Sequence, residues 1–409
     1  MGEGEENGQR ATKAHQRHLK QQVLAPVYRF AAIVPPELAS LCQDEAVALG
    51  LPSPVKSDAG IEFSGKLKAC YLPNLSLRTA SRILCRLPSF RAGVVSELFH
   101  KVLSGHWELW LNPAIPLEIK GFVWNSRVSH EGLVALTVMQ GIAKRFQALQ
   151  LTPPVRWSPA VGEEGLAGHS AKQRILVHLR SNHCEISLDT TGEHLHRRGY
   201  RLEHSGAPLR ETLAAGILLR SQWHGQRPLV DGMCGAGTIA IEAALLARRL
   251  PPGGRRSFLF QAWPSFQEKS WNHLHKEALK QVLAHSPVPI LALDRDLGAL
   301  AIARKNAERA GVGDDIQWQA ADFFDFKPQD HRLAPGLLVL DPPYGRRLES
   351  GGRDFYERLG LQLRQVFEGW HLAILAPSKA TALSLKLPSM RFWTICHGGS
   401  PIVVVLAKL

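Results

Sequence analysis

The stretch LLVLDPPY at residues 337–344 constrains the fold more than any other part of the chain. Its apolar residues 337–340 predict a short strand buried on both faces, as in a parallel sheet that is covered by helices. The prolines Pro342 and Pro343 cannot continue a sheet ladder, so the chain leaves the sheet at the carboxyl end of this strand. In open α/β sheets, that edge is where ligands bind.

The turn after this strand offers groups that suit a planar base carrying an exocyclic amine. The carboxylate of Asp341 and the carbonyl of Pro342 can accept hydrogen bonds from the two N–H groups of such an amine, while Tyr344 stacks on the ring. The candidate catalytic residues are therefore Asp341, Pro342, Pro343 and Tyr344. In the alternative interpretation, Asp341 caps the turn and Tyr344 belongs to the core.

A glycine-rich loop, DGMCGAGT at residues 231–238, lies between a predicted strand and a predicted helix. Glycines let the backbone approach a ligand closely, and the helix N-terminus offers free N–H groups. The loop sequence also matches the dinucleotide-binding fingerprint G-x-G-x-x-G/A. In that fingerprint an acid at the end of the next strand follows about 20 residues later, and this chain has no strand-end acid at that distance. The candidate ligand-binding residues here are Asp231, Cys234, Gly235, Gly237 and Thr238.

Successive predicted strands end in an acid: Asp231, Asp294 and Asp322 precede the strand that ends in Asp341. Each acid alone is more often a helix cap, but the carboxyl ends of parallel strands meet at one edge of a sheet. We expect Asp294 to hold the two hydroxyls of a ribose, Asp322 to accept from an adenine amine, and Phe323 to pack on the adenine ring. A nucleoside bearing a sulfonium would place its methyl group against an amine held at residues 341–344.

The formal net charge of +13 and the pI of about 9.7 favour a polyanionic partner, with nucleic acid ahead of an acidic membrane. The alternative is a basic protein without such a partner. Six cysteines are scattered without a CxxC pair, which argues against a zinc site or a disulfide framework and for a reducing compartment. No apolar run has the length of a membrane span, and the N-terminus has no apolar signal core, so we expect a cytoplasmic protein that binds no membrane. From the cysteines, we expect no bound metal.

Two basic segments are candidates for contact with nucleic acid. HLHRRGYR mixes cations with an aromatic ring, as proteins that bind a phosphate backbone and a base do, although an ordinary linker would also fit. A second pair of arginines follows the LDPPY motif. The candidate RNA-binding residues are Arg197, Arg198, Tyr200, Arg201, Arg346 and Arg347.

The order of predicted elements divides the chain. A polar tail (1–25) precedes an α+β unit (26–87), a second α+β unit (88–190) and a linker (191–206). In the first unit, residues 75–90 predict a helix with Arg78, Arg82 and Arg86 on one face. In the second, Ser129 is expected to cap a helix whose apolar face includes Leu133, Leu136, Ile142 and Phe146. Residues 207–409 alternate strands and helices and end in a hairpin, which predicts a doubly wound parallel sheet with an antiparallel edge.

The chain resembles the THUMP-domain-containing class I RNA methyltransferases, specifically the guanine-N2 methyltransferases of large-subunit (23S) ribosomal RNA. The resemblance extends over nearly all residues after the tail. The motifs that carry it are SLDTTGEHLHRRGYR, APLRETLAAGIL, DGMCGAGTIAIEAALLA, LPPGGRRSFLFQAWPSF, ALDRD with ARKNAERAG, and LDPPYGRRL.

This resemblance implies S-adenosyl-L-methionine as cofactor and a Rossmann-like, seven-stranded class I methyltransferase sheet in residues 207–409. It also implies an N-terminal α+β module, ferredoxin-like (26–87) plus THUMP (88–190), that binds structured RNA. By position, it assigns Gly235, Gly237, Asp294 and Asp322 to the cofactor site and residues 341–344 to the target base.

Three residues depart from the family pattern. Gly232 and Ala236 replace the usual proline and a frequent serine, and Asp341 stands where close ribosomal relatives often have asparagine. Adenine-N6 methylases frequently have aspartate there, so an adenine-N6 methylase of RNA or DNA is the nearest alternative. An RNA-binding protein that retains the fold without activity, and a dehydrogenase, are the others.

Overall fold

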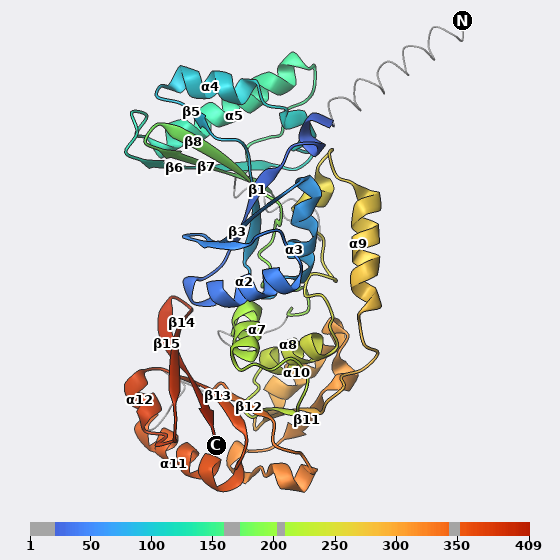
Figure 1. Cartoon of the computed structure of the whole chain (residues 1–409), viewed down its shortest axis with the longest axis vertical. Coiled ribbons are helices and arrows are strands. Elements are labelled where there is room, and N and C mark those ends of the chain that lie inside the picture. Colours follow the sequence, from blue (N-terminus) through green and yellow to red (C-terminus); the bar gives the residue numbers. More distant parts are fainter. Residues whose placement is uncertain (1–20, 159–171, 203–208, 343–351) are drawn as a thin grey trace, which may run out of the picture.

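The computed structural model describes residues 21–158, 172–202, 209–342 and 352–409. These residues form two β-sheets with their helices, arranged one after the other along the long axis of the molecule (Figure 1). Within the described ranges, no helix is both long enough and apolar enough to cross a membrane.

Eight strands of the N-terminal half form one sheet in the order β2-β3-β1-β4-β8-β7-β6, with β5 paired to β8. The pair β6 and β7 is parallel, whereas the other pairs of this sheet are antiparallel. The strands are β1 (Tyr28–Ile33), β2 (Val55–Ser57), β3 (Gly60–Gly65), β4 (Arg82–Arg86), β5 (Phe90–Arg91), β6 (Leu117–Trp124), β7 (Gln173–Arg180) and β8 (His183–Asp189). The helices are α2 (Ala39–Ala48), α3 (Tyr71–Ser76), α4 (Val95–Leu103) and α5 (Glu131–Ala148).

The N-terminal sheet is continuous across the boundary predicted between residues 87 and 88. Strand β4 pairs with β1 on one side and with β8 on the other, so that Leu84 lies opposite both Ala31 and Asp189. Two units that share a sheet share its backbone hydrogen bonds, so they cannot move independently without breaking them. The limits of the two units stay a prediction.

The helix expected over residues 75–90 is wrong. Helix α3 ends at Ser76, and strand β4 begins at Arg82. The middle of β4 is buried on both faces, which favours a strand inside a sheet over a solvated helix. The three arginines of this segment do not form a common exposed face, because Arg78 and Arg82 are buried and Arg86 forms ion pairs on the sheet.

Helix α5 forms as expected, but its start and its buried face differ from the prediction. The residue that caps it is His130, whose Nδ1 accepts from the Leu133 N–H at 3.1 Å. The helix also starts one residue later than predicted, and it packs through a face that leaves Leu133 and Leu136 exposed. The buried face carries Val134, Val138, Ile142 and Phe146.

The second sheet has seven strands in the order β11-β10-β9-β12-β13-β15-β14. The first five are parallel, and β15 runs antiparallel to β13 and β14, as the sequence predicts. The strands are β9 (Leu229–Asp231), β10 (Ile290–Asp294), β11 (Gln317–Ala320), β12 (Leu337–Leu340), β13 (His371–Ala376), β14 (Arg391–His397) and β15 (Ser400–Lys408). The helices are α7 (Glu211–Arg220), α8 (Thr238–Ala247), α9 (Glu268–Lys280), α10 (Leu297–Ala310), α11 (Gly352–Val366) and α12 (Lys379–Leu383).

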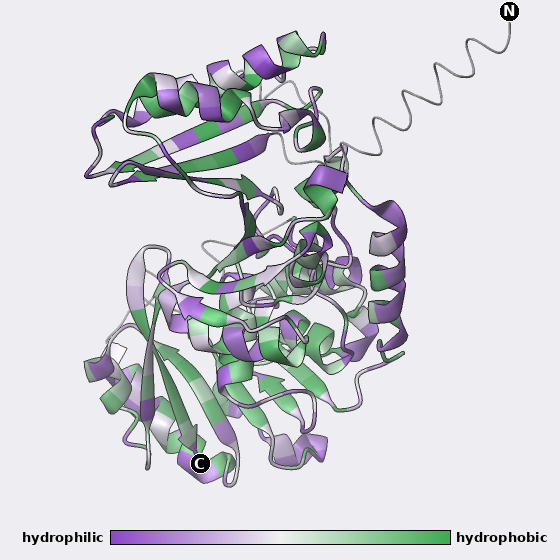
Figure 2. Ribbon diagram, turned by 45° about the horizontal axis from the view of Figure 1, so that its top comes forward, coloured by the Kyte–Doolittle hydropathy of each residue, from purple (hydrophilic) through white to green (hydrophobic). Residues whose placement is uncertain are grey.

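Short 3₁₀ helices connect the longer elements. They are η1 (Pro36–Leu38), η2 (Leu67–Cys70), η3 (Trp107–Leu109), η4 (Leu259–Ala262), η5 (Gly313–Asp315), η6 (Phe323–Asp325) and η7 (Pro328–His331). Helices cover both faces of the parallel strands: α8 and α10 pack on one face, while Leu359 and Leu363 of α11 pack on the other. The strands between them are hydrophobic over most of their length (Figure 2).

A buried ion pair joins the linker to the second half of the molecule. Arg198 is 3% exposed and faces Glu242 of α8, with two nitrogen–oxygen distances of 3.4 Å. The Tyr200 hydroxyl donates to the same carboxylate at 3.2 Å. Arg198 also donates to the Arg78 carbonyl at 2.6 Å, and Arg78 donates to the Leu250 carbonyl at 2.7 Å. The network therefore ties the N-terminal sheet, the linker and α8 together.

Replacing Arg198 by methionine is expected to lower the free energy of unfolding by about 3–5 kcal/mol, because the Glu242 carboxylate would stay buried without its cation. Arg197→Met is the matched control: that neighbour is exposed and pairs with Glu193 at the surface, so a change below about 1 kcal/mol is expected. Denaturant titration measures both. The double variant Arg198→Met/Glu242→Leu should regain much of the loss; equal losses at Arg197 and Arg198 would contradict the assignment.

Candidate active site

The carboxyl ends of β9, β10, β11 and β12 meet at one edge of the second sheet. The strand order reverses at β9, which lies between β10 and β12, and ligands bind at such reversals in open α/β sheets. The pairing aligns Asp231 with Ala292 and Val339. Asp294 lies two residues after Ala292, and Asp341 lies two residues after Val339. The structure therefore brings these three acids to one edge.

The loop after β9 is tied to the strands on both sides of it. The Gly232 N–H donates to the Val339 carbonyl at 3.0 Å, and the Cys234 N–H donates to the Leu293 carbonyl at 3.0 Å. A third bond, from the Gly237 N–H to the Cys234 carbonyl at 2.8 Å, closes the turn into α8. The backbone of the loop is thereby fixed before any ligand arrives.

Two glycines of this loop have left-handed backbone angles, with φ of 52° at Gly235 and 79° at Gly237. Their surroundings differ. A side chain at Gly237 would meet Ala303 at 2.9 Å and Trp318 at 3.0 Å, whereas nothing lies within 4 Å of the corresponding position at Gly235. Gly237 is therefore needed for packing, and Gly235 presents bare backbone to open space, where a ligand can approach.

Asp294 holds this open turn. Its Oδ2 accepts from the Gly235 N–H at 2.8 Å, and its Oδ1 accepts from the Asp296 N–H at 3.0 Å. The carboxylate is half-buried, and each of its oxygens has a further lone pair. Asp294 can therefore position the loop and accept two hydroxyl groups at the same time.

Asp322 caps the short helix η6, because its Oδ1 accepts from the Phe324 N–H at 2.9 Å. Its carboxylate is half-buried, so its remaining oxygen stays available to an amine. Phe323 is 2% exposed and stacks on Phe367 in the core, with ring centroids 5.6 Å apart. The expected contact of Phe323 with an adenine ring is therefore corrected: Phe323 supports the loop from inside.

Asp231 is fully buried beneath the loop, where its Oδ2 accepts from the Ala240 N–H of α8 at 3.1 Å. Burial raises the pKa of Asp231 well above its ordinary value, and the carboxylates of Asp341 and Asp294 add to the effect. The expected contact of Asp231 with a ligand is corrected to a role in joining β9 to α8.

Burial, with the carboxylates of Asp231 and Asp294, likewise raises the pKa of the Cys234 thiol, which suits packing and not nucleophilic attack.

One residue that supports the loop was not singled out from the sequence. Asn306 of α10 is fully buried, and its amide donates to the Ala236 carbonyl at 3.3 Å. The motif ARKNAERAG that contains it is part of the resemblance, but nothing in its spacing marks the asparagine. Thr238, the first residue of α8, is buried, so its side chain packs within the fold.

The turn after β12 is described as far as Pro342. Asp341 is half-buried and close enough to Asp231 to affect its pKa, and Pro342 is buried. The predicted residues Pro343, Tyr344, Arg346 and Arg347 lie outside the described residues. Within the described ranges, no group of three or more His, Cys, Asp or Glu side chains is placed to hold a metal ion.

The structure also places the predicted RNA-binding residues of the linker. Arg198 and Tyr200 are each 3% exposed, so the expectation that they contact RNA is corrected to a role in joining the two sheets. Arg201 is largely covered and pairs with Glu211 of α7 at 2.9 Å. Arg197 is exposed, and for this residue contact with RNA stays a prediction.

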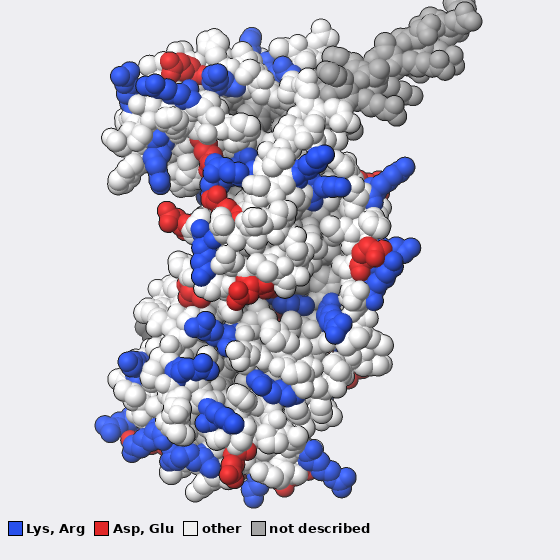
Figure 3. All heavy atoms as spheres, viewed as in Figure 1, with Lys and Arg blue, Asp and Glu red and all other residues white. Residues whose placement is uncertain are grey.

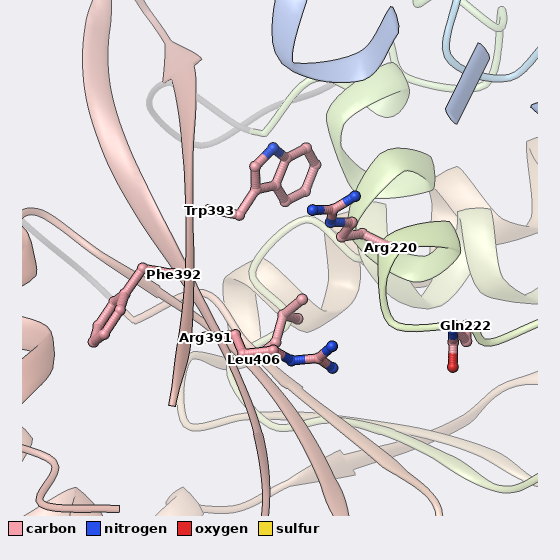
Figure 4. A pocket seen from close by; sticks show the side chains of 6 residues that line it. All are labelled: Arg220, Gln222, Arg391, Phe392, Trp393 and Leu406. Atoms are coloured by element: carbon pink, nitrogen blue, oxygen red, sulfur yellow. The ribbon is translucent and has the colours of Figure 1, made fainter. Parts of the chain in front are cut away.

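A hollow of about 230 Å³ lies between α7 and β14, away from the acidic edge (Figure 4). Arg220 and Trp393 face each other across it, with the guanidinium carbon 5.8 Å from the ring centroid. The hollow also contains Arg391, at the beginning of β14. Because β14 is parallel to β13, this position lies near the amino ends of the parallel strands, opposite the candidate site.

A five-stranded parallel sheet extended by an antiparallel pair, with a glycine-rich loop after its central strand, defines a class I methyltransferase. Residues 198–393 match the family described as RMKL-like, methyltransferase domain, and residues 29–84 match the RlmL ferredoxin-like domain. The chain belongs to this family of methyltransferases. It is 30% identical to Putative RNA methyltransferase slr0064 of Synechocystis sp., over 93% of this chain and 96% of that protein.

Ribosomal RNA large subunit methyltransferase K/L of Syntrophotalea carbinolica is 33% identical over 91% of this chain. The chain spans 52% of the length of that relative. Among solved structures, SMU.472, a putative methyltransferase complexed with SAH, matches with a TM-score of 0.79 and 26% identity, over 93% of this chain and 98% of the other. A predicted N6-adenine-specific DNA methylase from Listeria monocytogenes matches with a TM-score of 0.77 and 26% identity, over 93% and 96%.

Asp231→Asn is expected to stabilise the protein increasingly as the pH rises. An acid whose pKa is raised by folding contributes stability at low pH, and that stability is lost as the pH rises through the folded-state pKa. Between the unfolded-state and folded-state pKa values, the loss is about 1.4 kcal/mol for each pH unit. Asparagine keeps an oxygen for the Ala240 N–H and cannot ionise. Melting temperatures from acidic to alkaline pH measure the effect; a variant that falls further below wild type at alkaline pH would contradict it.

Proposed function

We propose that the protein transfers a methyl group from S-adenosyl-L-methionine to the exocyclic N2 amine of a guanine in large-subunit ribosomal RNA. The observation that carries the proposal is the position of Asp341 and Pro342, directly after β12 and beside the glycine loop at the reversal of the sheet. The family is one of methyltransferases, and a structure similar to this one was solved with SAH. The relatives named for ribosomal RNA of the large subunit support the choice of substrate.

The residues at the edge fit S-adenosyl-L-methionine. The bare backbone of Gly235 faces open space, and a side chain there would occupy the approach. Asp294 has two oxygens available for the ribose hydroxyls, and Asp322 has one available for the adenine amine. When bound, the cofactor supplies an electrophilic methyl group on a sulfonium.

An aryl amine is a poor nucleophile because its lone pair is conjugated with the ring. We assign to Asp341 and the Pro342 carbonyl the role of accepting hydrogen bonds from its two N–H groups. These bonds direct the lone pair out of conjugation and towards the methyl carbon. The methyl group would pass from the sulfonium sulfur to the amine nitrogen, and the Asp341 carboxylate would take the released proton. No covalent enzyme intermediate is required, and positioning with electrostatics supplies most of the acceleration.

The charge of the protein suits an RNA substrate. The formal net charge is +13, and Lys and Arg predominate over Asp and Glu on the face shown in Figure 3. A polyanion gains affinity from such a surface without regard to its sequence. A guanine inside a helix must leave its stack to reach the edge beside Asp341, and we assign Tyr344 to stack on the displaced base.

A second candidate is transfer to the N6 amine of adenine. The similarity to a predicted N6-adenine-specific DNA methylase and the aspartate at position 341 favour it. Both amines lie on an aromatic ring and need the same two acceptors, so the chemistry at Asp341 does not separate them. Analysis of the methylated nucleoside does.

Asp341→Ala is expected to lower the rate of methyl transfer on the order of 100-fold or more, because it removes an acceptor that acts on the reacting amine. Labelled S-adenosyl-L-methionine and ribosomal RNA lacking its own modifications measure the rate. Asp341→Asn is the matched control: it keeps an acceptor oxygen but cannot take the proton. Release of N2-methylguanosine from the wild-type product supports the proposal; N6-methyladenosine would replace the substrate, and full activity in Asp341→Ala would contradict the site.

Asp294→Asn is expected to weaken cofactor binding about tenfold or more, since hydrogen bonds to a charged group are each worth about 1.5–3 kcal/mol. Asp322→Asn should weaken it less, because it tests a single bond and asparagine keeps the oxygen that can cap η6. Titration calorimetry with SAH measures both affinities. Asp325→Asn, an exposed acid on η6, is the control and should bind as wild type does. An unchanged affinity in Asp294→Asn would contradict the assignment.

A further inference from the structure

At β6 and β7, one face of the N-terminal sheet is not covered by any helix of the described residues. Helices α4 and α5 lie over β6, β7 and β8 on a single side (Figure 1). Gly121 of β6 faces α5, since a side chain there would meet the Glu131 carbonyl at 2.5 Å and Val134 at 3.4 Å. Successive residues of a strand alternate between faces, so Phe122 and Trp124, one and three residues after Gly121, both point away from α5.

Three rings gather on the uncovered face. Phe122 of β6 stacks on His178 of β7, with ring centroids 4.9 Å apart and planes 12° apart. Burial lowers the pKa of His178, so its ring is largely neutral near pH 7 and stacks as an uncharged surface. Trp124 lies two residues further along β6 and is 72% exposed, while Phe122 is 42% exposed. Another planar ring can stack on aromatic side chains that are exposed to this extent.

Cations lie beside these rings. The register places Trp124 next to Arg180, Arg180 next to His183, and His183 next to Arg91, all of them exposed. This row across the sheet contains no acid. A ring followed by positive charge is the combination that binds the bases and phosphates of a single strand.

The acids of the same face are already paired. Glu185 lies next to His178 in the register and binds Arg29 and Arg86, and Glu62 binds Arg86 at 2.9 Å. These pairs neutralise the part of the sheet near β1 and β4. The unbalanced positive charge is left at the outer strands, beside the exposed rings.

A polar hollow of about 610 Å³ lies at the end of β6, next in the chain to Trp124 and Arg180. It is formed by the loop that follows Trp124 and by the turn between β7 and β8. The side chains and backbone that form it are those of Val123, Asn125, Ser126, Arg127, Ser129, Ser181 and Asn182. Amide and hydroxyl groups of this kind hydrogen-bond to the edges of unpaired bases.

We propose that Phe122, Trp124, His178 and Arg180 form a platform on which unpaired bases of the RNA substrate stack, with the neighbouring hollow receiving the next nucleotide. The inference depends on the proposed function for its RNA, and it adds the kind of RNA: a single strand, loop or bulge in place of a regular duplex. A-form duplexes bury their base faces and are recognised by shape and backbone contacts. In a regular duplex, an exposed ring of the protein finds no free base face on which to stack.

Trp124→Ala in the full chain is expected to lower the affinity for a single-stranded RNA oligonucleotide about tenfold, as the loss of one stacked base does. Affinity for an RNA duplex of the same length should stay within a factor of about two. Fluorescence anisotropy over a series of salt concentrations measures both. Arg180→Ala should instead reduce the slope of affinity against salt by about one, because it removes a phosphate contact.

Leu136→Ala is the matched control, since it removes an exposed apolar side chain from α5 on the other side of the sheet. It should bind single strands as wild type does. No loss in Trp124→Ala, an equal loss in Leu136→Ala, or a wild type that binds duplex but no single strand would each overturn the platform. Binding of SAH and methyl transfer, measured on the same preparations, separate the two proposals: a wild type that binds single strands through Trp124 but transfers no methyl group would overturn the proposed function alone.

Discussion

A charge buried in a protein must be paired, and in this molecule that requirement joins the two sheets. Arg198 and Glu242 have almost no exposed surface, so each is stable only in the presence of the other. The guanidinium also holds the carbonyl of Arg78, which belongs to the N-terminal half. Glu242 lies on α8, the helix that begins at the glycine loop. The loop at the candidate site is therefore connected to the N-terminal sheet through one helix and one ion pair.

Much of the second sheet could be predicted from the sequence because its signals are local. Apolar runs that end in an acid mark buried parallel strands, and the meeting of Asp231, Asp294 and Asp341 at one edge follows from strand direction alone. The sequence does not show how deeply each of these acids is buried. Asp231 and Asp294 occupy the same place in their motifs, yet one is fully buried under the loop and the other is half-buried and faces outward. The register of the strands decides this difference, because Asp231 lies level with Ala292 and Asp294 lies two residues further towards the edge of the sheet.

The errors in the N-terminal half have a different physical cause. The arginines at positions 78, 82 and 86 have a helical spacing, but β4 pairs with β1 and with β8, which lies about 100 residues later in the chain. Pairing between segments so far apart overrides a local preference and leaves no trace in the spacing of residues. The same holds for HLHRRGYR. Its composition suits RNA, and only the structure shows that Arg198 and Tyr200 are bound to Glu242.

The continuity of the N-terminal sheet has a consequence for how a substrate would be selected. Strands β6 and β1 belong to one hydrogen-bonded surface, and the buried network fixes that surface to α8. The separation between Trp124 and Asp341 is then a property of the fold and not of a flexible tether. Under the two proposals made above, the fold would act as a ruler that selects an RNA by the length between an unpaired segment bound at Trp124 and the base to be modified at Asp341.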